Sequence, residues 1–222
     1  MRSGEEETRD HSSLSLVPGT RGVQVLPGVH LVRDDFVNTY LVETQGSLVL
    51  VDAGINGDPV LRYLERTGLS LSSVELVIIT HHHYDHVDGL RRIREATGAR
   101  VAAHRDEASF IERATGIRPD ILLEHHSMVK GLLVIHTPGH TPGHIALLDP
   151  GRKALFTGDL VYERDGELHE IPRHYSIDPD RNRESIRSLL GYSFKHLLPS
   201  HGNPVLGNAK KKLEELAEKL ST

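Results

Sequence analysis

Short apolar runs rich in β-branched residues recur along the chain, and each is followed by glycine, proline or a side chain that can bind a metal. Runs of this length and composition predict buried β-strands. Because potential ligands follow them directly, we expect several strand ends to deliver acids and imidazoles to one rim of a sheet system. The runs cover residues 47–51, 74–79, 132–135, 153–156 and 194–198.

Between these runs, apolar residues recur at helical spacing. Leu90 and Ile93 share one helix face, which Gly98 ends, and Pro59 begins another helix. The segment 163–176 has no clear period, so we expect a loop there that covers a site. The predicted helices cover residues 59–67, 89–98, 106–114, 182–190 and 206–220, and further strands are predicted over 22–33, 38–43 and 100–103.

The densest candidate chemistry is Thr80-His81-His82-His83-Tyr84-Asp85-His86, directly after the run at 74–79. An extended backbone sends His81, His83 and Asp85 to the same side, because alternate residues of a strand share a face. His86 then faces a different direction. Neutral imidazole and carboxylate are ligands for zinc and its first-row neighbours. Splitting them between two directions is what a pair of adjacent metals requires.

Three later strand ends add single potential ligands. Asp159 follows one run and His201 another, while His140 and His144 both follow a Pro-Gly pair after the run at 132–135. The spacing alone leaves either of those two histidines open as the ligand. A histidine inside a strand run, such as His136, is expected to pack and form hydrogen bonds instead.

Composition limits the alternatives. A length of 222 residues suits one sizeable domain, which we place at residues 21–222. The net charge of −5 and the pI near 6.3 argue against a general nucleic-acid binder, and no apolar run has the length of a membrane span. With no cysteine, a metal must be held by nitrogen and oxygen donors alone. Residues 1–20 lack the apolar core of a signal peptide, so we expect a disordered tail and a cytoplasmic protein.

The motifs together resemble those of the metallo-β-lactamase fold superfamily of metallohydrolases. Thr-His-X-His-X-Asp-His, Thr-Pro-Gly-His-Thr, Phe-Thr-Gly-Asp and Ser-His-Gly occur in that family's order, and the resemblance covers residues 22–204. It implies an α/β protein with an αβ/βα sandwich, in which two mixed sheets lie face to face between outer helices and the metals sit at one edge.

The resemblance also implies which residues bind which metal. His81, His83 and His140 correspond to the ligands of a first ion, and His140 is favoured over His144 by the family pattern. Asp85, His86 and His201 correspond to the ligands of a second ion. Asp159 would bridge the two, and Asp52 resembles the acid that supports the histidine loop without touching metal. Two Zn²⁺ per chain are expected, with iron or manganese as alternatives.

Such a site predicts a hydrolase. A catalytic zinc keeps a position open for water and lowers its pKa from 15.7 toward about 7, giving a hydroxide between the metals as nucleophile. Asp85 is expected to ligate and also to orient that hydroxide.

The substrate expected is a small ester-like carbonyl compound, a lactone or a thioester. Residues 137–145 resemble the glyoxalase II branch, but Asp88 stands where that branch has glycine. Tyr162, three residues after Asp159, resembles the tyrosine with which N-acyl homoserine lactonases support the leaving oxygen. We therefore name Asp85 and Tyr162 as catalytic candidates.

Alternatives stay open at this point. A persulfide dioxygenase uses a single iron with the same ligand residues, and β-lactamase or phosphoesterase activity could arise on the same site. A metal-binding module without activity is the non-enzymatic alternative. The expected partner is a small molecule, with no nucleic acid or membrane, and the chain could be a monomer or a homodimer.

Overall fold

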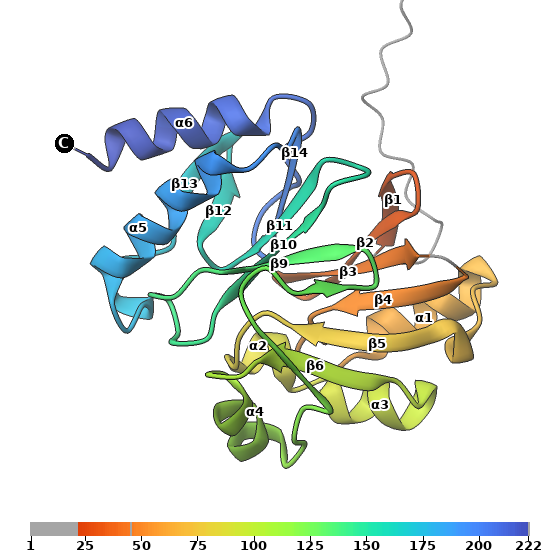
Figure 1. Ribbon diagram of the computed structural model, residues 1–222. Coiled ribbons are helices and arrows are strands. Elements are labelled where there is room, and N and C mark those ends of the chain that lie inside the picture. The colour runs from red at the N-terminus through yellow and green to blue at the C-terminus, as the bar shows by residue number, and fades with distance from the viewer. Residues whose placement is uncertain (1–21, 45, 222) are drawn as a thin grey trace, which may run out of the picture.

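The computed structural model describes residues 22–44 and 46–221, and the tail expected over residues 1–20 lies outside this part of the chain. Two sheets lie face to face, with helices on both outer sides (Figure 1). The first sheet contains, in spatial order, β1 (Gly22–Leu26), β2 (Val29–Asp34), β3 (Val37–Thr44), β4 (Ser47–Val51), β5 (Val74–Ile79), β6 (Arg100–His104) and β7 (Ile121–Leu123). Its strands are antiparallel from β1 to β4 and parallel from β4 to β7.

The second sheet is also mixed. It runs β14 (His196–Pro199), β11 (Ala154–Gly158), β10 (Ile145–Asp149), β9 (Leu132–His136) and β8 (Met128–Val129), and only the β11–β14 pair is parallel. The helices are α1 (Asp58–Thr67), α2 (Tyr84–Val87), α3 (Leu90–Thr97), α4 (Ala108–Thr115), α5 (Pro179–Ser188) and α6 (Ala209–Lys219), with single 3₁₀ turns at Leu71–Ser73, Arg173–Tyr175 and Leu189–Gly191.

The core explains why the strands read as continuous apolar runs. In β4, Val49 and Val51 face the second sheet, while Leu48 and Leu50 face the helices outside. Alternate side chains point to opposite faces and both faces are buried, so no polar position interrupts the run. Between the sheets, Tyr40 packs edge-on against Phe156, with ring centroids 5.3 Å apart.

Helices cover the two outer faces separately. Helices α1, α3 and α4 bury residues such as Tyr63 and Ile93 against the first sheet. Helices α5 and α6 bury residues such as Ile186 and Leu213 against the second, on the opposite side of the molecule in Figure 1. This arrangement confirms the αβ/βα sandwich that the sequence motifs implied.

The prediction of a loop over residues 163–176 is wrong for the first half of that segment. Strands β12 (Val161–Arg164) and β13 (Glu167–Glu170) form an antiparallel hairpin there. Asp165 and Gly166 make its two-residue turn with φ of 53° and 80°, the left-handed conformation that suits such turns. The hairpin is amphipathic, because Val161 and Leu168 enter the core beneath α6.

Among the described helices, none combines the length and the apolar run that a membrane span needs. The cytoplasmic location and the single domain over residues 21–222 stay predictions.

Candidate metal centre

The predicted ligands meet at the edge where parallel strands of both sheets end. The segment after β5 supplies His81 to His86, and the ends of β11 and β14 supply Asp159 and His201. Neighbouring parallel strands end at the same edge, so side chains far apart in sequence become adjacent. Two backbone hydrogen bonds join the sheets here, from Ile145 N–H to the Thr80 carbonyl (3.1 Å) and from Asn38 N–H to the Ser200 carbonyl (2.8 Å).

A first group of ligand atoms comes from His81, His83, His140 and Asp159. The three ring nitrogens lie 3.1, 3.2 and 2.9 Å from one another. Asp159 Oδ2 lies 3.9 Å from His81 Nε2 and 3.7 Å from His140 Nε2. Ligand atoms around a tetrahedral zinc with bonds of about 2.0–2.1 Å lie about 3.3 Å apart, so the spacing of this group brackets that of a zinc site.

Three imidazole nitrogens in mutual contact cannot all be satisfied by one another. Each nitrogen either donates or accepts one hydrogen bond, so a triangle of three leaves at least one pair mismatched. A cation at the centre would be contacted by all three lone pairs at once.

A second group comes from Asp85, His86, His201 and again Asp159. Asp85 Oδ2 lies 3.7 Å from His86 Nε2 and 3.4 Å from His201 Nε2. Asp159 Oδ1 lies 3.2 Å from His86 Nε2, and its Oδ2 lies 3.3 Å from His201 Nε2. The structure thus brings all seven predicted ligands together as two groups that share Asp159.

Two atoms of the predicted ligands also lack a well-placed hydrogen-bond partner. His86 Nε2 and Asp159 Oδ1 are buried and lie 3.2 Å apart as an ion pair, but neither meets a hydrogen-bond partner in good geometry. Buried polar atoms are rarely left in that state. The donor set is nitrogen and oxygen only, which zinc, iron and manganese accept, so the residues fit a metal pair.

The distal ring nitrogens are anchored by neighbouring groups. His81 Nδ1 lies 3.1 Å from Thr80 Oγ1, and His201 Nδ1–H donates to the Phe36 carbonyl at 3.2 Å. His86 Nδ1–H donates to Asp52 Oδ2 at 2.8 Å. Such contacts fix the tautomer and would leave Nε2 of these three histidines free to bind a metal.

Asp52 occupies the supporting position that the family resemblance implied. Its Oδ1 accepts the Thr80 N–H at 2.7 Å, and its Oδ2 accepts the Thr80 hydroxyl at 2.9 Å as well as His86 Nδ1–H. The carboxylate therefore fixes the start of the histidine loop and one of its imidazoles.

The two groups differ in their electrostatics. Burial holds the pKa of His81 well below its usual value and lowers the pKa of His140 to about 4, so these imidazoles are neutral near pH 7. Burial also disfavours charge on His86 and His201, but Asp159 outweighs it, together with Asp52 for His86 and Asp85 for His201. The pKa of His86 is well above its usual value and that of His201 is raised to about 10.

We therefore expect the second ion to bind with a strong pH dependence. In the metal-free protein His86 and His201 hold protons at neutral pH, so an ion must displace them, and affinity should rise by up to about 10-fold per pH unit for each proton displaced. The first group should bind almost independently of pH from 6 to 8, because the pKa of His140 is about 4.

Zinc titrations of metal-free protein against a chelating dye at pH 6, 7 and 8 measure both affinities. Equal pH dependence for the two ions would contradict this account.

The geometry also separates His140 from His144. His144 Nε2 accepts the Asp159 N–H at 3.1 Å and its Nδ1 donates to Thr137 Oγ1 at 2.9 Å, so both ring nitrogens are in use. His140 instead directs Nε2 at His81 and His83. His140 therefore belongs to the first group, and His144 positions the backbone of Asp159.

Sequence reasoning missed Glu107, a fully buried carboxylate just before α4. It joins the two ligand loops, because its Oε1 accepts the His82 N–H at 3.0 Å and contacts His82 Nδ1, while Oε2 accepts the Gly143 N–H at 2.8 Å. A Cβ at Gly143 would lie 2.5 Å from Glu107 N, so only glycine permits this approach. A helix-start glutamate carries no local signal that predicts such a contact.

A separate histidine pair does not form a third metal site of this kind. His104, Asp106 and His136 place potential ligand atoms within 4.8 Å of one another. The rings of His104 and His136 are stacked, with centroids 3.9 Å apart and planes 11° apart. The nitrogen lone pairs of an imidazole lie in the plane of its ring, so two parallel stacked rings cannot both direct a lone pair at one ion. The stacking therefore fits the prediction that His136 packs against its neighbours.

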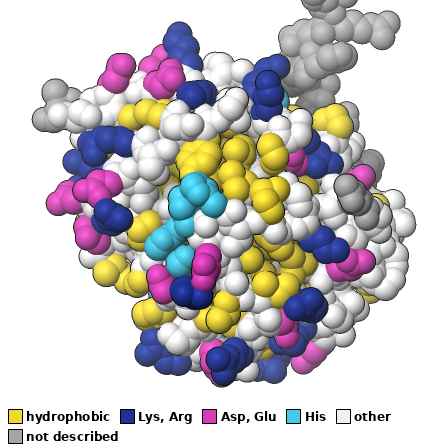
Figure 2. All heavy atoms as spheres, in the orientation of Figure 1, with side chains coloured by type: hydrophobic (Ala, Val, Ile, Leu, Met, Phe, Trp, Pro, Cys, Tyr) yellow, Lys and Arg dark blue, Asp and Glu magenta, His cyan; other side chains and the backbone are white. Residues whose placement is uncertain are grey.

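A cavity of about 620 Å³ opens onto the metal centre. Five predicted ligands line it, while His81 and His86 are fully buried. The remaining lining residues are Phe36, Tyr84, Ile171, His174 and Tyr175. Figure 2 shows one face of the molecule, on which histidine side chains gather beside hydrophobic and acidic side chains; His81, His86 and His140 are buried and contribute almost nothing to the surface of the molecule.

Tyr162 is not among the residues that line this cavity. Its ring stacks on His169, with centroids 5.1 Å apart, and Arg164 lies over it. Its catalytic role stays a prediction.

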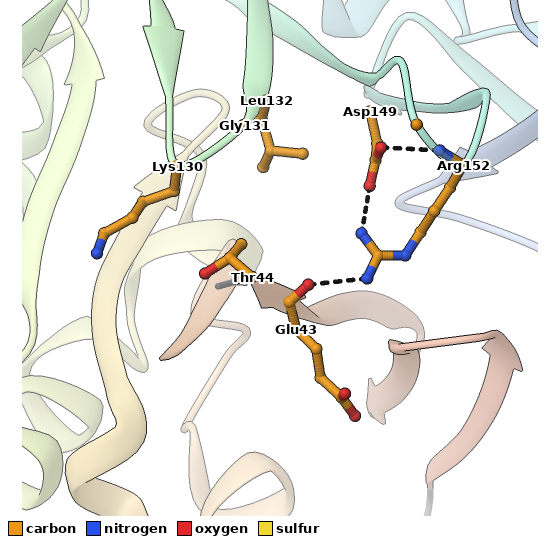
Figure 3. A pocket seen from close by; sticks show the side chains of 8 residues that line it. Glu43, Thr44, Lys130, Gly131, Leu132, Asp149 and Arg152 are labelled. Atoms are coloured by element: carbon orange, nitrogen blue, oxygen red, sulfur yellow. Dashed lines mark hydrogen bonds and ion pairs between the residues drawn. The ribbon is translucent and has the colours of Figure 1, made fainter. Parts of the chain in front are cut away.

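A second cavity, also of about 620 Å³, contains none of the predicted ligands (Figure 3). Its charged groups pair with one another or with nearby side chains. Arg152 contacts Asp149 Oδ2 at 2.6 Å and the Glu43 carbonyl at 2.8 Å, and Lys130 contacts Glu75 at 2.5 Å. These contacts make the cavity a surface hollow lined by salt bridges, and they do not indicate a catalytic site.

Comparison with known proteins agrees with this fold. The family model described as the metallo-beta-lactamase superfamily matches residues 32–201. A probable metallo-hydrolase of Bacillus subtilis, YflN, is 30% identical over 94% of this chain and 97% of its own length. A hydroxyacylglutathione hydrolase of Cereibacter sphaeroides is 43% identical over 52% of this chain, which spans 44% of that enzyme. The crystal structure of TTHA1623 in a di-iron-bound form superposes with a TM-score of 0.61 and 30% identity, over 76% of this chain and 88% of that one.

Proposed function

This chain belongs to the metallo-beta-lactamase superfamily, and we propose that it is a hydrolase with two metal ions that cleaves small ester-like carbonyl substrates, lactones or thioesters. The observation that carries the proposal is the pair of ligand groups sharing Asp159. Zinc is the expected metal, and the di-iron form of TTHA1623 makes iron the first alternative to test.

The seven ligands would hold the ions, His81, His83 and His140 on one side and Asp85, His86 and His201 on the other, with Asp159 between them. When bound, the ions supply a water of lowered pKa and polarise the substrate carbonyl. Asp85 lines the cavity and can accept the proton of the attacking water. Water oxygen adds to the acyl carbon, the acyl bond to oxygen or sulfur breaks, and the proton goes to the departing alcohol or thiol.

A substrate panel on metal-depleted and metal-reloaded protein tests this proposal. We expect lactones or thioesters to be hydrolysed only after reloading, and phosphoesters and a chromogenic β-lactam to be hydrolysed more slowly. Oxygen consumption with a persulfide and one iron per chain would support the dioxygenase alternative instead. If the protein binds no metal, both metal-dependent reactions are excluded and a non-enzymatic binding role remains.

Tyr162 and Tyr175 are the two tyrosines considered for contact with the leaving group. Tyr162 is supported by its resemblance to the lactonase tyrosine, whereas Tyr175 lines the cavity wall. We expect Tyr162→Phe to lower kcat by about 10-fold or more, because it removes the hydroxyl proposed to contact the transition state, and Tyr175→Phe, which keeps the ring, to change kcat less than about 2-fold. Steady-state kinetics on the best substrate of the panel decide between them, and the reverse order would assign the leaving-group contact to Tyr175.

A further inference from the structure

Three aromatic rings are left in solvent at the mouth of the metal-bearing cavity. Phe36, Tyr84 and Tyr175 line it and are 51%, 59% and 58% exposed, and Ile171 adds a buried apolar wall. Exposed apolar surface gathered at a cavity beside candidate ligands is typical of a binding site for an apolar group. We call Phe36, Tyr84 and Tyr175 the aromatic rim.

Contacts around Phe36 hold part of this rim in place. Phe36 lies in the tight turn between β2 and β3, next to Asp35 with φ of 63°. Its ring stacks on His201, with centroids 5.9 Å apart and planes 19° apart, and meets the edge of Tyr84 at 6.5 Å. The Phe36 carbonyl accepts His201 Nδ1–H, so the turn that presents the ring also anchors a predicted ligand.

Tyr175 reaches the cavity from a different segment. It ends the 3₁₀ turn Arg173–Tyr175, where its N–H donates to the Pro172 carbonyl at 2.9 Å. Its ring packs against His174 at 4.2 Å, and its neighbour Ser176 lies 3.4 Å from His140 Nδ1. The rim therefore combines the β2–β3 turn with the segment before α5.

The cavity wall offers no fixed cation of its own. Among the described residues that line it there is no lysine or arginine, and His174 is its one imidazole outside the predicted ligands. Arg173, beside the lining, is paired with Asp180 at 2.9 Å, and Arg33 donates to Asn203 at 2.5 Å. Among these described lining residues, a carboxylate or phosphate of the substrate would find no guanidinium or ammonium partner away from the metals.

We propose that the substrate is uncharged and carries an apolar acyl or leaving group that packs against the aromatic rim. This rests on the hydrolase function proposed above and narrows its substrate class. Glutathione thioesters fit this wall poorly, because their carboxylates would lose hydration without a paired cation. Neutral esters, lactones and thioesters with aryl or alkyl groups fit it.

Two matched thioesters test the charge requirement. Phenylacetyl-N-acetylcysteamine and phenylacetyl-glutathione share the acyl group and differ in the thiol, which is a small neutral amide in the first and a charged tripeptide in the second. On metal-loaded protein we expect kcat/KM to be at least about 10-fold higher for the neutral thioester. Equal values, or a preference for the glutathione thioester, would overturn the inference while leaving the hydrolase function intact.

Variants at Tyr175 test the rim itself. Tyr175→Ala should lower kcat/KM for the phenylacetyl thioester about 10-fold and for the acetyl thioester less than about 2-fold, because only the first loses ring packing. Tyr175→Arg should raise kcat/KM for the glutathione thioester relative to that for the neutral thioester. Leu122→Ala, at an apolar residue that is 49% exposed on β7, is the matched control. It should change neither the phenylacetyl-to-acetyl ratio of kcat/KM nor the glutathione-to-neutral ratio. Unchanged selectivity in both Tyr175 variants would exclude a role for this ring.

Binding separates this inference from the proposed function. The two thioethers in which CH₂ replaces the carbonyl cannot be hydrolysed, and calorimetry on metal-loaded protein gives their affinities. If no substrate of the panel, lactone or thioester, is cleaved but the neutral thioether binds at least about 10-fold more tightly, the hydrolase proposal fails and the recognition inference holds. Equal binding of the two thioethers overturns the inference whatever the activity.

Discussion

Replacing Asp159 with alanine is expected to lower kcat/KM by about 10³-fold or more and to remove most of the second metal ion. Asp159 is the residue that both ligand groups share, with oxygens 3.2 Å from His86 Nε2 and 3.3 Å from His201 Nε2. Without it, each group loses one ligand and the protein loses the only carboxylate placed between the two groups among the described residues.

Metal content per chain and kinetics on the same preparation measure this effect. Asp159→Asn keeps the shape and one acceptor oxygen, so it should retain more metal than Asp159→Ala. Asp58→Ala is a control at a surface aspartate at the start of α1, which pairs with Arg92 away from the cavity. Full metal content together with full activity in Asp159→Ala would refute the bridging assignment.

The second large effect is expected at His140. His140→Ala should strip or loosen the first ion and lower kcat/KM by about 10²-fold or more, because this imidazole approaches His81 at 3.2 Å and His83 at 2.9 Å. His144→Ala should keep both ions and lower activity by about 10-fold, as expected when a residue that only supports a ligand is removed. His144 holds the Asp159 N–H rather than a metal.

Equilibrium dialysis against zinc, with circular dichroism to confirm folding, distinguishes the two variants. Loss of the first ion from His144→Ala, with retention in His140→Ala, would reverse the assignment.

Much of this site could be predicted because the side chains that form it directly follow recognisable apolar runs in the sequence. Each apolar run marks a buried strand, and ligands that directly follow strands must reach a sheet edge, which placed Asp159 and His201 correctly at the rim. Spacing alone could not choose between His140 and His144, because both follow Pro-Gly. The choice came from the resemblance to a family, and hydrogen bonds to Thr137 and Asp159 show what His144 does instead.

Other features depend on contacts that no local pattern encodes. Glu107 joins His82 to Gly143 across 25 and 36 residues of chain. The sequence predicts a loop where the β12–β13 hairpin lies, because only Val161 and Leu168 mark the buried face of the hairpin, although Asp165-Gly166 is a hairpin turn signal. The aromatic rim joins residues from three separate segments and becomes visible only in the folded chain.

The central claim is that one carboxylate, Asp159, holds two metal ions in this chain. A crystal structure of zinc-loaded protein, with anomalous diffraction at the zinc edge, tests it most directly. We predict two anomalous peaks about 3.5–4 Å apart, with Asp159 in contact with both, His140 bound to one and His201 to the other. A single peak, or two ions without Asp159 between them, would contradict it.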